Sequence, residues 1–295
     1  MTKKITIGTR GSALALKQAD IVARALIEAD PSISVAVQVI ETHGDTNHAP
    51  IPLDTIGKGW FTKEIETALL HNKIDLAVHS LKDMADEMPE GLTIGAYLPR
   101  EDARDVLVTK KGEPLDELRL GAVVGTDSAR RQVQMLALRP DVRMQSLRGN
   151  VPTRLEKLAS ENYDAIILAS AGLKRLGLEK RITRYFEPHE MTPAPGQGTL
   201  AVQSRENDAR LRDVLARIND PDSAQAARIE RSFSLVTGGG CKAPTGAYAY
   251  REGDECCFVV MIVTESGRIL RDTIRVPWRE SENLGEVIAG KLLSA

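Results

Sequence analysis

The sequence predicts an α/β fold with two doubly wound lobes on mostly parallel sheets, followed by a small C-terminal α+β domain. Short apolar runs alternate with segments of helical periodicity through the first two thirds of the chain. Two of these runs open alike, at residues 7–13 and 124–129, each with a strand, Gly-Thr, a polar turn, Ser-Ala and a helix. From about Asp220 the alternation ends and two strands follow each other. At 295 residues the chain also exceeds the usual size of one domain.

The first lobe begins with a short strand, a Thr9–Ser12 turn and a periodic helix that closes at Asp30-Pro31. Its expected elements are strand 5–8, helix 13–29, strand 35–40, helix 61–70 and strand 76–78. The second lobe is expected to contain strand 120–124, helix 129–138 and strand 164–169. The C-terminal domain is expected to contain helix 223–235, strands 256–263 and 268–276, and a last helix after Ser281.

The chain crosses between the lobes at two predicted places, Leu98–Glu101 and Thr192–Gly198, the second of which is dense in proline and glycine. We therefore predict that residues 1–98 and 195–219 form lobe 1. Residues 99–194 are expected to form lobe 2, and residues 220–295 the C-terminal domain.

The composition excludes several classes of protein. Aromatic residues make up only 4% of the chain, which argues against recognition of nucleic acid by base stacking. No apolar run approaches membrane-spanning length, and the N-terminus lacks the apolar segment of a signal peptide. Three cysteines do not make a disulfide framework. We expect a cytoplasmic monomer without a metal site, since no paired-His or CxxC spacing occurs.

Positive charge gathers in the second lobe although the net charge is only −2. Residues 119–184 hold 13 lysines and arginines against 6 aspartates and glutamates. Several arginines lie beside glycines or at strand-to-helix turns, where free helix N–H groups also favour anions. Because adjacent helical residues diverge by about 100°, Arg130 and Arg131 can serve one ligand only if it is large. The arginines together predict an extended polyanionic ligand in a cleft between the lobes.

Two further residues stand out. Asp83 follows the predicted strand 76–78, which places it at the carboxyl edge of the sheet, where ligands bind. Nearby His79 is expected to be a buried histidine rather than a base. Cys241 follows three glycines and precedes Pro244, so we expect it on an accessible loop, whereas Cys256 and Cys257 belong to a buried strand.

Ordered motifs along nearly the whole chain resemble those of the porphobilinogen deaminase (hydroxymethylbilane synthase) family. The motifs are Gly8–Ser12, Lys58–Glu64, His79–Asp83, Arg100–Asp105, Gly125–Gln132, Arg148–Arg154, Ala194–Gly198 and Gly239–Cys241. The resemblance implies two lobes of periplasmic-binding-protein type and a small domain that carries the cysteine.

The resemblance also implies a dipyrromethane cofactor joined to Cys241 through a thioether. Four porphobilinogen units would add to this cofactor, each losing ammonia, before water releases a linear tetrapyrrole. The expected partners are thus porphobilinogen and the growing polypyrrole, with no nucleic acid and no membrane.

The resemblance assigns roles residue by residue. Asp83 matches the catalytic carboxylate. The expected cofactor-binding residues are Cys241, Lys82, Ser128, Arg130, Arg131, Thr126 and Ser170. The expected substrate-binding residues are Arg10, Ser12, Arg148, Arg154, Arg175, Gln197 and Lys58. We expect Asp83→Ala to cripple turnover and Arg131→Leu to block chain growth.

The chain departs from the family pattern at several positions. Asp127 stands where the family usually has serine, and we expect its carboxylate to point away from the ligand, because inward it would repel a carboxylate. Ala85, Ala129, Pro152 and Gln203 are also unusual, and the loop before Lys58 is one glycine short.

Two other functions compete with this one. A two-lobed anion sensor without chemistry would account for the lobes and the arginines, but not for Asp83 or Cys241. A cysteine hydrolase would use Cys241 as its nucleophile, yet no Cys–His pairing is recognisable in the sequence.

Overall fold

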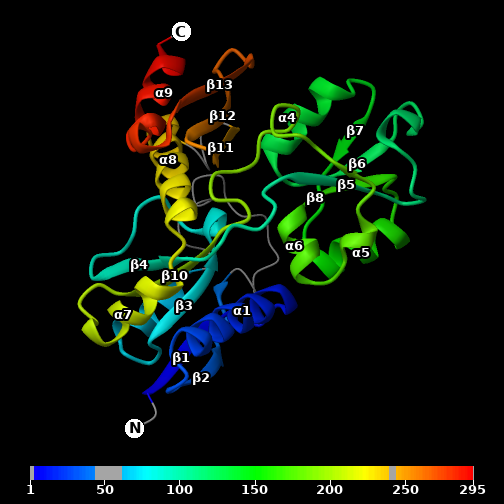
Figure 1. The fold of residues 1–295 in the computed structure, drawn as a ribbon. Coiled ribbons are helices and arrows are strands. Elements are labelled where there is room, and N and C mark those ends of the chain that lie inside the picture. The colour runs from blue at the N-terminus through cyan, green and yellow to red at the C-terminus, as the bar shows by residue number, and fades with distance from the viewer. Residues whose placement is uncertain (1–2, 44–61, 239–243, 295) are drawn as a thin grey trace.

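The computed structural model describes residues 3–43, 62–238 and 244–294, so Lys58 and Cys241 lie outside the described residues. Within the described residues the chain forms three sheets, each flanked by helices (Figure 1). We call the resulting units lobe 1, lobe 2 and the C-terminal unit.

Lobe 1 is built on a five-stranded sheet of order β2-β1-β3-β10-β4. The strands are β1 (Lys3–Thr9), β2 (Ile33–Val39), β3 (Leu76–Ser80), β4 (Leu92–Tyr97) and β10 (Leu200–Arg205). The helices are α1 (Ala13–Ala29), α3 (Lys63–Leu70) and α7 (Ala209–Ile218), and a 3₁₀ turn, η1 (Leu81–Asp83), follows β3. β1 runs parallel to β2 and β3, whereas β10 lies antiparallel between β3 and β4.

Lobe 2 repeats this arrangement with the strand order β7-β6-β8-β5-β9. The strands are β5 (Asp105–Thr109), β6 (Val123–Gly125), β7 (Arg143–Gln145), β8 (Ala165–Ala169) and β9 (Arg184–Tyr185). The helices are α4 (Ala129–Leu138), α5 (Val151–Ser160) and α6 (Ser170–Arg175), with 3₁₀ turns η2 (Leu115–Glu117) and η3 (Glu179–Arg181). β5 is the antiparallel strand, between β8 and β9. In each lobe the antiparallel strand is therefore the first one that the chain forms after crossing over.

The C-terminal unit is a three-stranded antiparallel sheet covered by two helices. Its elements are α8 (Pro221–Thr237), β11 (Thr245–Glu252), β12 (Glu255–Val263), β13 (Ile269–Pro277), the 3₁₀ turn η4 (Trp278–Glu280) and α9 (Leu284–Leu293). Phe233 of α8 meets Phe258 of β12 edge to face, with ring centroids 5.6 Å apart. Cys256 and Cys257 are buried, as expected for a core strand.

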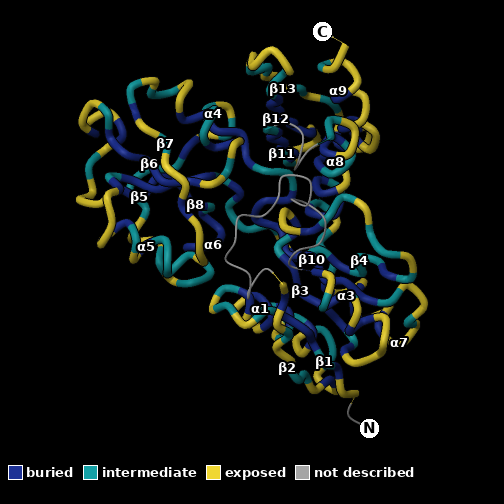
Figure 2. Tube along the Cα trace, turned by 180° about the vertical axis from the view of Figure 1, so that it is seen from behind, coloured by how far each residue is buried: buried dark blue, intermediate teal, exposed yellow. Residues whose placement is uncertain are grey.

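The cores lie between each sheet and its helices, where the tube in Figure 2 is coloured as buried. In lobe 1, α1 contributes Val22 and Leu26, which pack with Ile7 of β1. Lobe 2 has apolar clusters around Leu107 and around Val106, which belong to β5 and point to opposite faces because side chains alternate along a strand. A strand in a sheet that is buried on both faces has a continuous apolar sequence, and β8 is such a strand.

The two crossings between the lobes lie side by side. Leu98 N donates to Leu200 O (3.1 Å), and Glu101 N donates to Gly198 O (3.1 Å). Gly198 has φ +90°, and a Cβ there would come within 2.3 Å of Glu101 O. Only glycine fits so close a backbone contact. The domain boundaries at residues 98, 194 and 219 stay predictions.

Most predicted elements are present, with small shifts at their ends. Helices α1 and α4 match the predicted ranges, and strand 120–124 begins later, at Val123, because Leu120 is 82% exposed. The sheets are parallel around β1 and β6, but each contains an antiparallel strand that we did not predict. Strand β11 was also missed.

Candidate functional site

Asp83 and Lys82 lie on η1, directly after the buried strand β3. Leu81 and Met84, on either side of them, are buried, and Met84 N donates to Leu81 O (3.1 Å). Because these two apolar side chains point into the core, Lys82 and Asp83 between them point outward, and both residues are exposed. The turn therefore displays a carboxylate and an ammonium at the sheet edge where ligands bind in α/β folds.

Lys82 reaches across to the return crossing. Its Nζ donates to Gln197 Oε1 (3.1 Å). Although the residue has solvent access, desolvation around its ammonium lowers the pKa of Lys82 to about 8, Asp83 raises it, and the charge of Arg131 lowers it further. Loss of hydration is therefore the main reason for the lowered pKa of Lys82, and the nearby acidic and basic side chains act in opposite directions.

Arg10 and Ser12 occupy the turn before α1. Ser12 is the N-cap of α1, and its Oγ accepts a hydrogen bond from Ala15 N (3.2 Å), which leaves its O–H able to donate. Arg10 is half-buried, and its charge is one reason why the pKa of His79 is lowered.

His79 is buried and holds a fixed partner. Its Nε2 lies 3.0 Å from Gln203 Oε1, while Gln203 Nε2 donates to Glu66 Oε1 (3.3 Å). Since the amide oxygen faces the ring, Nε2 is the protonated nitrogen. Desolvation lowers the pKa of His79 to about 4, so the ring is neutral near pH 7. This supports the prediction of a buried histidine that is not a base.

The two adjacent arginines of α4 converge on one carboxylate. Arg130 Nη1 donates to Asp105 Oδ2 (2.6 Å) and to Thr192 O (2.6 Å). Arg131 donates to Asp105 Oδ1 through Nε (3.0 Å) and Nη2 (2.7 Å), and to Ile167 O through Nη1 (3.1 Å). Asp105 has no exposed surface, and both arginines are 6% exposed. The expected divergence of the two side chains is thus overcome by a buried anion between them.

Asp105 was not among the predicted site residues, although it ends the motif Arg100–Asp105. Its two arginines hold the pKa of this carboxyl far below its usual range, against the opposing effect of burial. Removing one partner of such a buried pair costs about 3–5 kcal/mol. Arg131→Leu would therefore disturb folding as well as any ligand.

Gln197 connects this pair to the other lobe. The side chain is fully buried, and its Nε2 donates to Asp105 Oδ1 (2.9 Å) and to Ala103 O (2.7 Å). Its Oε1 accepts from Lys82 Nζ and, at 3.5 Å, from Arg131 Nη2. We call this set, Lys82 and Gln197 with Asp105, Arg130 and Arg131, the lobe junction.

Three predicted hydroxyl residues surround the helix starts of lobe 2. Ser128 is the N-cap of α4, and its Oγ accepts from Arg131 N (3.5 Å). Thr126 is buried, and its Oγ1 accepts from Ser128 N (3.2 Å). Ser170, the first residue of α6, is fully buried, and its Oγ has no hydrogen-bond partner among the described residues. An orphaned buried hydroxyl is uncommon and costs free energy unless a ligand or water meets it.

The expectation that Asp127 points away from the ligand stays a prediction, but its carboxylate has two partners in the structure. Asp127 Oδ2 forms an ion pair with Arg148 Nε (2.7 Å), and Oδ1 accepts from Ser146 Oγ (2.6 Å). The side chains are half-exposed, at 44% for Arg148 and 35% for Asp127. The physical reason for this pairing is that an exposed arginine directly across the turn offers a better partner than water alone.

Arg154 and Arg175 are half-buried cations on α5 and α6. Arg154 Nε donates to Gly149 O (2.7 Å), and Arg175 Nη2 donates to Gly198 O (2.7 Å). Burial lowers the pKa of each to about 10, so both stay charged at neutral pH. Arg131 also lowers the pKa of Arg154, while Asp127 and Asp83 raise it. The pKa of Arg154 therefore depends on charged residues of both lobes.

Lys82, Arg130, Arg154 and Arg175 share one electrostatic property. Burial lowers the pKa of each of these cations, which means that their surroundings do not fully replace lost hydration. An anion placed among them would be stabilised. Lys58 and Cys241 lie outside the described residues. Helix α8, the element before Cys241 in the sequence, is capped by Gly238 in a left-handed conformation with φ 67°.

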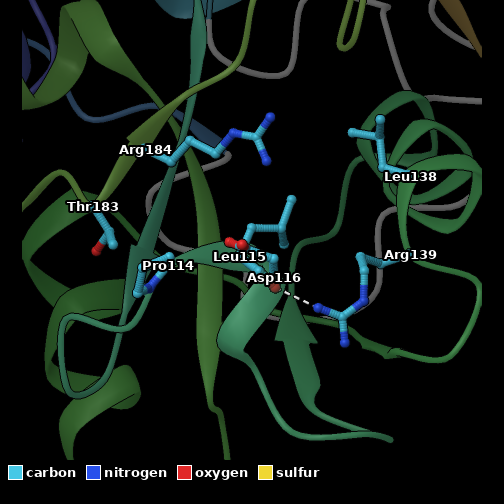
Figure 3. A pocket seen from close by; sticks show the side chains of 7 residues that line it. All are labelled: Pro114, Leu115, Asp116, Leu138, Arg139, Thr183 and Arg184. Carbon is cyan, nitrogen blue, oxygen red and sulfur yellow. Dashed lines mark hydrogen bonds between the residues drawn. The ribbon is translucent and has the colours of Figure 1, made fainter.

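A cavity of about 520 Å³ lies elsewhere in lobe 2, and Figure 3 shows the side chains that line it. Arg139 on its wall is already bonded to Leu115 O and to Asp141. The lining residues are Pro114, Leu115, Asp116, Leu138, Arg139, Thr183 and Arg184. None of them is a predicted site residue.

Two properties of the described residues bear on other classes of function. No group of three or more His, Cys, Asp or Glu side chains among them could hold a metal ion. No helix among them is both long enough and apolar enough to cross a membrane.

Comparison with known families gives one strong match. Residues 5–213 match the family model described as "Porphobilinogen deaminase, dipyromethane cofactor binding domain". Among curated proteins, porphobilinogen deaminase of Roseiflexus castenholzii is 45% identical, with 100% of this chain and 97% of the relative covered. Porphobilinogen deaminase of Oceanobacillus iheyensis is 44% identical, with 99% of this chain and 94% of the relative covered.

Solved structures give more distant matches. The methionine-binding protein MetQ is 13% identical, with a TM-score of 0.46 and coverage of 84% of this chain and 99% of MetQ. A probable amino-acid transporter binding protein of Bacillus subtilis is 12% identical, with a TM-score of 0.42 and coverage of 74% and 90%.

Proposed function

Because the chain belongs to the porphobilinogen deaminase family, we propose that it is a transferase that condenses porphobilinogen units stepwise, with loss of ammonia, onto a dipyrromethane held by Cys241. Hydrolysis then releases hydroxymethylbilane, in tetrapyrrole biosynthesis. The observation that carries the proposal is the lobe junction, where the Asp83 turn of lobe 1 meets the paired arginines of lobe 2 through Gln197.

The residues present fit a dipyrromethane with acidic side chains. Burial removes part of the hydration of three cations, Lys82, Arg154 and Arg175, and a bound anion would offset that loss. Ser170 Oγ is a buried hydroxyl without a partner among the described residues, so it can bond a polar group of a ligand. When bound, the dipyrromethane supplies the pyrrole carbon to which the first substrate is joined.

Each side chain has a task in this proposal. Arg10, Arg148, Arg154 and Arg175, with Ser12, Gln197 and Lys58, hold the carboxylates of the substrate and of the growing chain. Ser12 and Thr126 accept hydrogen bonds from backbone N–H groups, and their hydroxyl hydrogens stay available for a carboxylate. Lys82, Ser128, Arg130 and Arg131, with Thr126 and Ser170, hold the cofactor end. Arg130 and Arg131 are almost completely buried against Asp105, so this group of two cations and one anion contributes a fixed net positive charge from beneath the surface.

Asp83 is the proposed catalytic residue. Loss of ammonia leaves positive charge on the pyrrole of the substrate, and a fixed carboxylate near the ring N–H stabilises that charge and can hold the proton. Asp83 is exposed to an incoming ligand, directly follows Lys82 and acts electrostatically on Arg154, which supports a position near the cations proposed to hold carboxylates.

The test is turnover of porphobilinogen by purified variants. Asp83→Ala is expected to lower the rate of ammonia release by about 10²–10⁴-fold, the range for loss of a positioned acid–base group. Asp116→Ala, an exposed aspartate at the separate lobe 2 cavity, is the control and should keep the wild-type rate. Near-normal turnover of Asp83→Ala would remove Asp83 from the mechanism.

A further inference from the structure

Lobe 2 contains two arginine–aspartate arrangements of opposite character. Asp105, with Arg130 and Arg131, is almost completely buried, and its hydrogen bonds are part of the fold. Asp127 and Arg148 form a short ion pair, Oδ2 to Nε 2.7 Å, while 35% and 44% of their side-chain surfaces are exposed. An exposed pair is held weakly, because water can replace either partner. The second pair can therefore be opened by a ligand, and the first cannot.

Asp127 stands at a sensitive position. It immediately precedes Ser128, the N-cap of α4, so its negative charge is favoured by the positive end of that helix. Ser146 Oγ donates to its other oxygen at 2.6 Å, which fixes the carboxylate in the orientation that faces Arg148. Asp127 also acts on Arg154, whose pKa it raises. One fixed carboxylate thus interacts with two of the arginines proposed to hold substrate.

We propose that Asp127 lowers the affinity for substrate by competing with the carboxylates of the substrate for Arg148. The inference rests on the proposed function, because only a carboxylate-bearing ligand meets this competition. To bind a ligand carboxylate, Arg148 must either give up its ion pair with Asp127 or contact both carboxylates at once, which brings two negative charges together. Both routes weaken binding at Arg148. Asp127 therefore limits the affinity for each pyrrole unit that passes this arginine and favours its departure.

The expected size of the effect follows from the exposure of the pair. Exposed ion pairs contribute about 0.2–1 kcal/mol, which corresponds to roughly a 1.4- to 5-fold change in an equilibrium constant. Asp127→Asn should bind a pyrrole dicarboxylate about two- to fivefold more tightly than the wild type. In steady state it should lower KM more than it changes kcat, because the residue acts on binding rather than on the bond-breaking step.

The experiment measures the dissociation constant of a pyrrole that carries acetate and propionate but a methyl group in place of the aminomethyl group, so that it cannot condense. The proteins are the wild type, Asp127→Asn, Arg148→Leu and the double variant, with Asp141→Asn as control. Asp141 pairs with Arg139, which lines the separate cavity, and its substitution should not change binding. Thermal unfolding of each variant verifies that it is folded.

Tighter binding by Asp127→Asn that disappears in the Arg148→Leu background supports the proposal. Unchanged or weaker binding by Asp127→Asn overturns it, because the pair would then preorganise Arg148 rather than occupy it. A gain that persists without Arg148 also overturns it, since the effect would be a general one of charge. Wild-type protein that does not bind the probe at all contradicts the proposed function itself, and is distinguishable from these outcomes.

Discussion

Lys82 and Gln197 show how single side chains connect the two lobes. Gln197 comes from the return crossing and donates to Asp105 of lobe 2 while accepting from Lys82 of lobe 1. A neutral amide is suited to this position because it can donate and accept at once. A glutamate there would place a second buried carboxylate beside Asp105, at a cost in desolvation and repulsion. The junction therefore depends on a neutral side chain at position 197.

The lowered pKa of Lys82, about 8, predicts that its proposed hold on the carboxylates at the cofactor end weakens at alkaline pH. The ammonium form attracts carboxylates, and its proton dissociates as the pH rises through about 8 rather than 10.5. Values of kcat/KM should fall through this range, because they report ionisation of the free enzyme. Lys82→Arg keeps its charge and should shift the fall to higher pH.

A pH profile of kcat/KM between pH 6.5 and 9.5 checks this prediction. Lys174→Arg is the matched control, since the pKa of Lys174 is raised by its bond to Glu101 and its replacement should leave the profile unchanged. A wild-type profile that stays flat through pH 9, or a Lys82→Arg profile that falls like the wild type, would contradict the assignment.

At the scale of elements, α8 supports the turn that carries Asp83. Ala227 of α8 packs in one cluster with Leu81 and Met84, the apolar residues that flank Lys82 and Asp83. Arg231 Nη2 donates to Ala85 O (2.9 Å) and Asp86 O (2.8 Å), and Ser234 Oγ donates to Asp86 Oδ2 (3.1 Å). The same helix ends at Gly238, three residues before Cys241. One rigid element thus connects the proposed catalytic turn to the start of the proposed anchor loop.

Arg231→Met should therefore slow the reaction although Arg231 has no proposed contact with substrate. Loss of the hydrogen bonds from a charged donor to two carbonyls is expected to lower the free energy of unfolding by about 1–3 kcal/mol and to loosen the turn. We expect kcat to fall about tenfold with KM nearly unchanged, and Arg231→Lys to restore part of the rate. Steady-state kinetics together with urea unfolding would test this.

The control for Arg231 is Arg228→Met, one turn earlier on α8 on a more exposed face. Its kcat and its free energy of unfolding should stay near the wild-type values. An Arg231→Met enzyme with full kcat would show that α8 does not control the position of the turn.

The elements that the sequence predicted well are those whose pattern is local. Helix α1 has apolar positions spaced for one buried face and the N-cap Ser12, and its observed bounds match the prediction. Strand β11 was missed because Gly246 and Ala247 weaken the apolar pattern. Gly246 is required by a neighbour distant in sequence, since a Cβ there would lie 2.9 Å from Thr192 O. Such a contact leaves no local signal.

The candidate site shows the same limit. The cations and Asp83 could be proposed from motifs, but the buried partner of Arg130 and Arg131 could not, because Asp105 lies on strand β5, 25 residues before Arg130 of helix α4. The ion pair of Asp127 with Arg148 was likewise outside sequence reasoning, which considered only the helix dipole and repulsion of the ligand. Pairing between distant segments is a property of the folded chain.

At the scale of the whole molecule, Glu230 holds the C-terminal unit against both crossings. The carboxylate is fully buried on α8, and it accepts from Arg100 Nη1 (2.5 Å) and Nη2 (3.1 Å) beside the outward crossing. It also accepts from Gly196 N (2.6 Å) on the return crossing and from Ala249 N (2.8 Å) on β11. Four donors from three segments meet one carboxylate, so the three units are joined at a single point.

Glu230→Gln should destabilise the protein strongly. The glutamine amide nitrogen would face an N–H group that now donates to the carboxylate, so two donors would meet. Arg100 would also lose its buried counter-ion, at a cost of about 3–5 kcal/mol. The exposed pair of Glu252 and Arg275 in the same unit is the matched comparison, and Glu252→Gln should lower the free energy of unfolding far less. Equal unfolding free energies for the two variants would contradict the role of Glu230.

If Cys241 anchors a dipyrromethane on which Asp83 works, the mass of the intact protein will show the attached group. The wild-type protein should be heavier than its sequence mass by a two-pyrrole adduct, and Cys241→Ser should have the bare sequence mass and no turnover. A sensor or a cysteine hydrolase would carry no such adduct. Active wild-type protein with an unmodified Cys241 thiol would contradict the account.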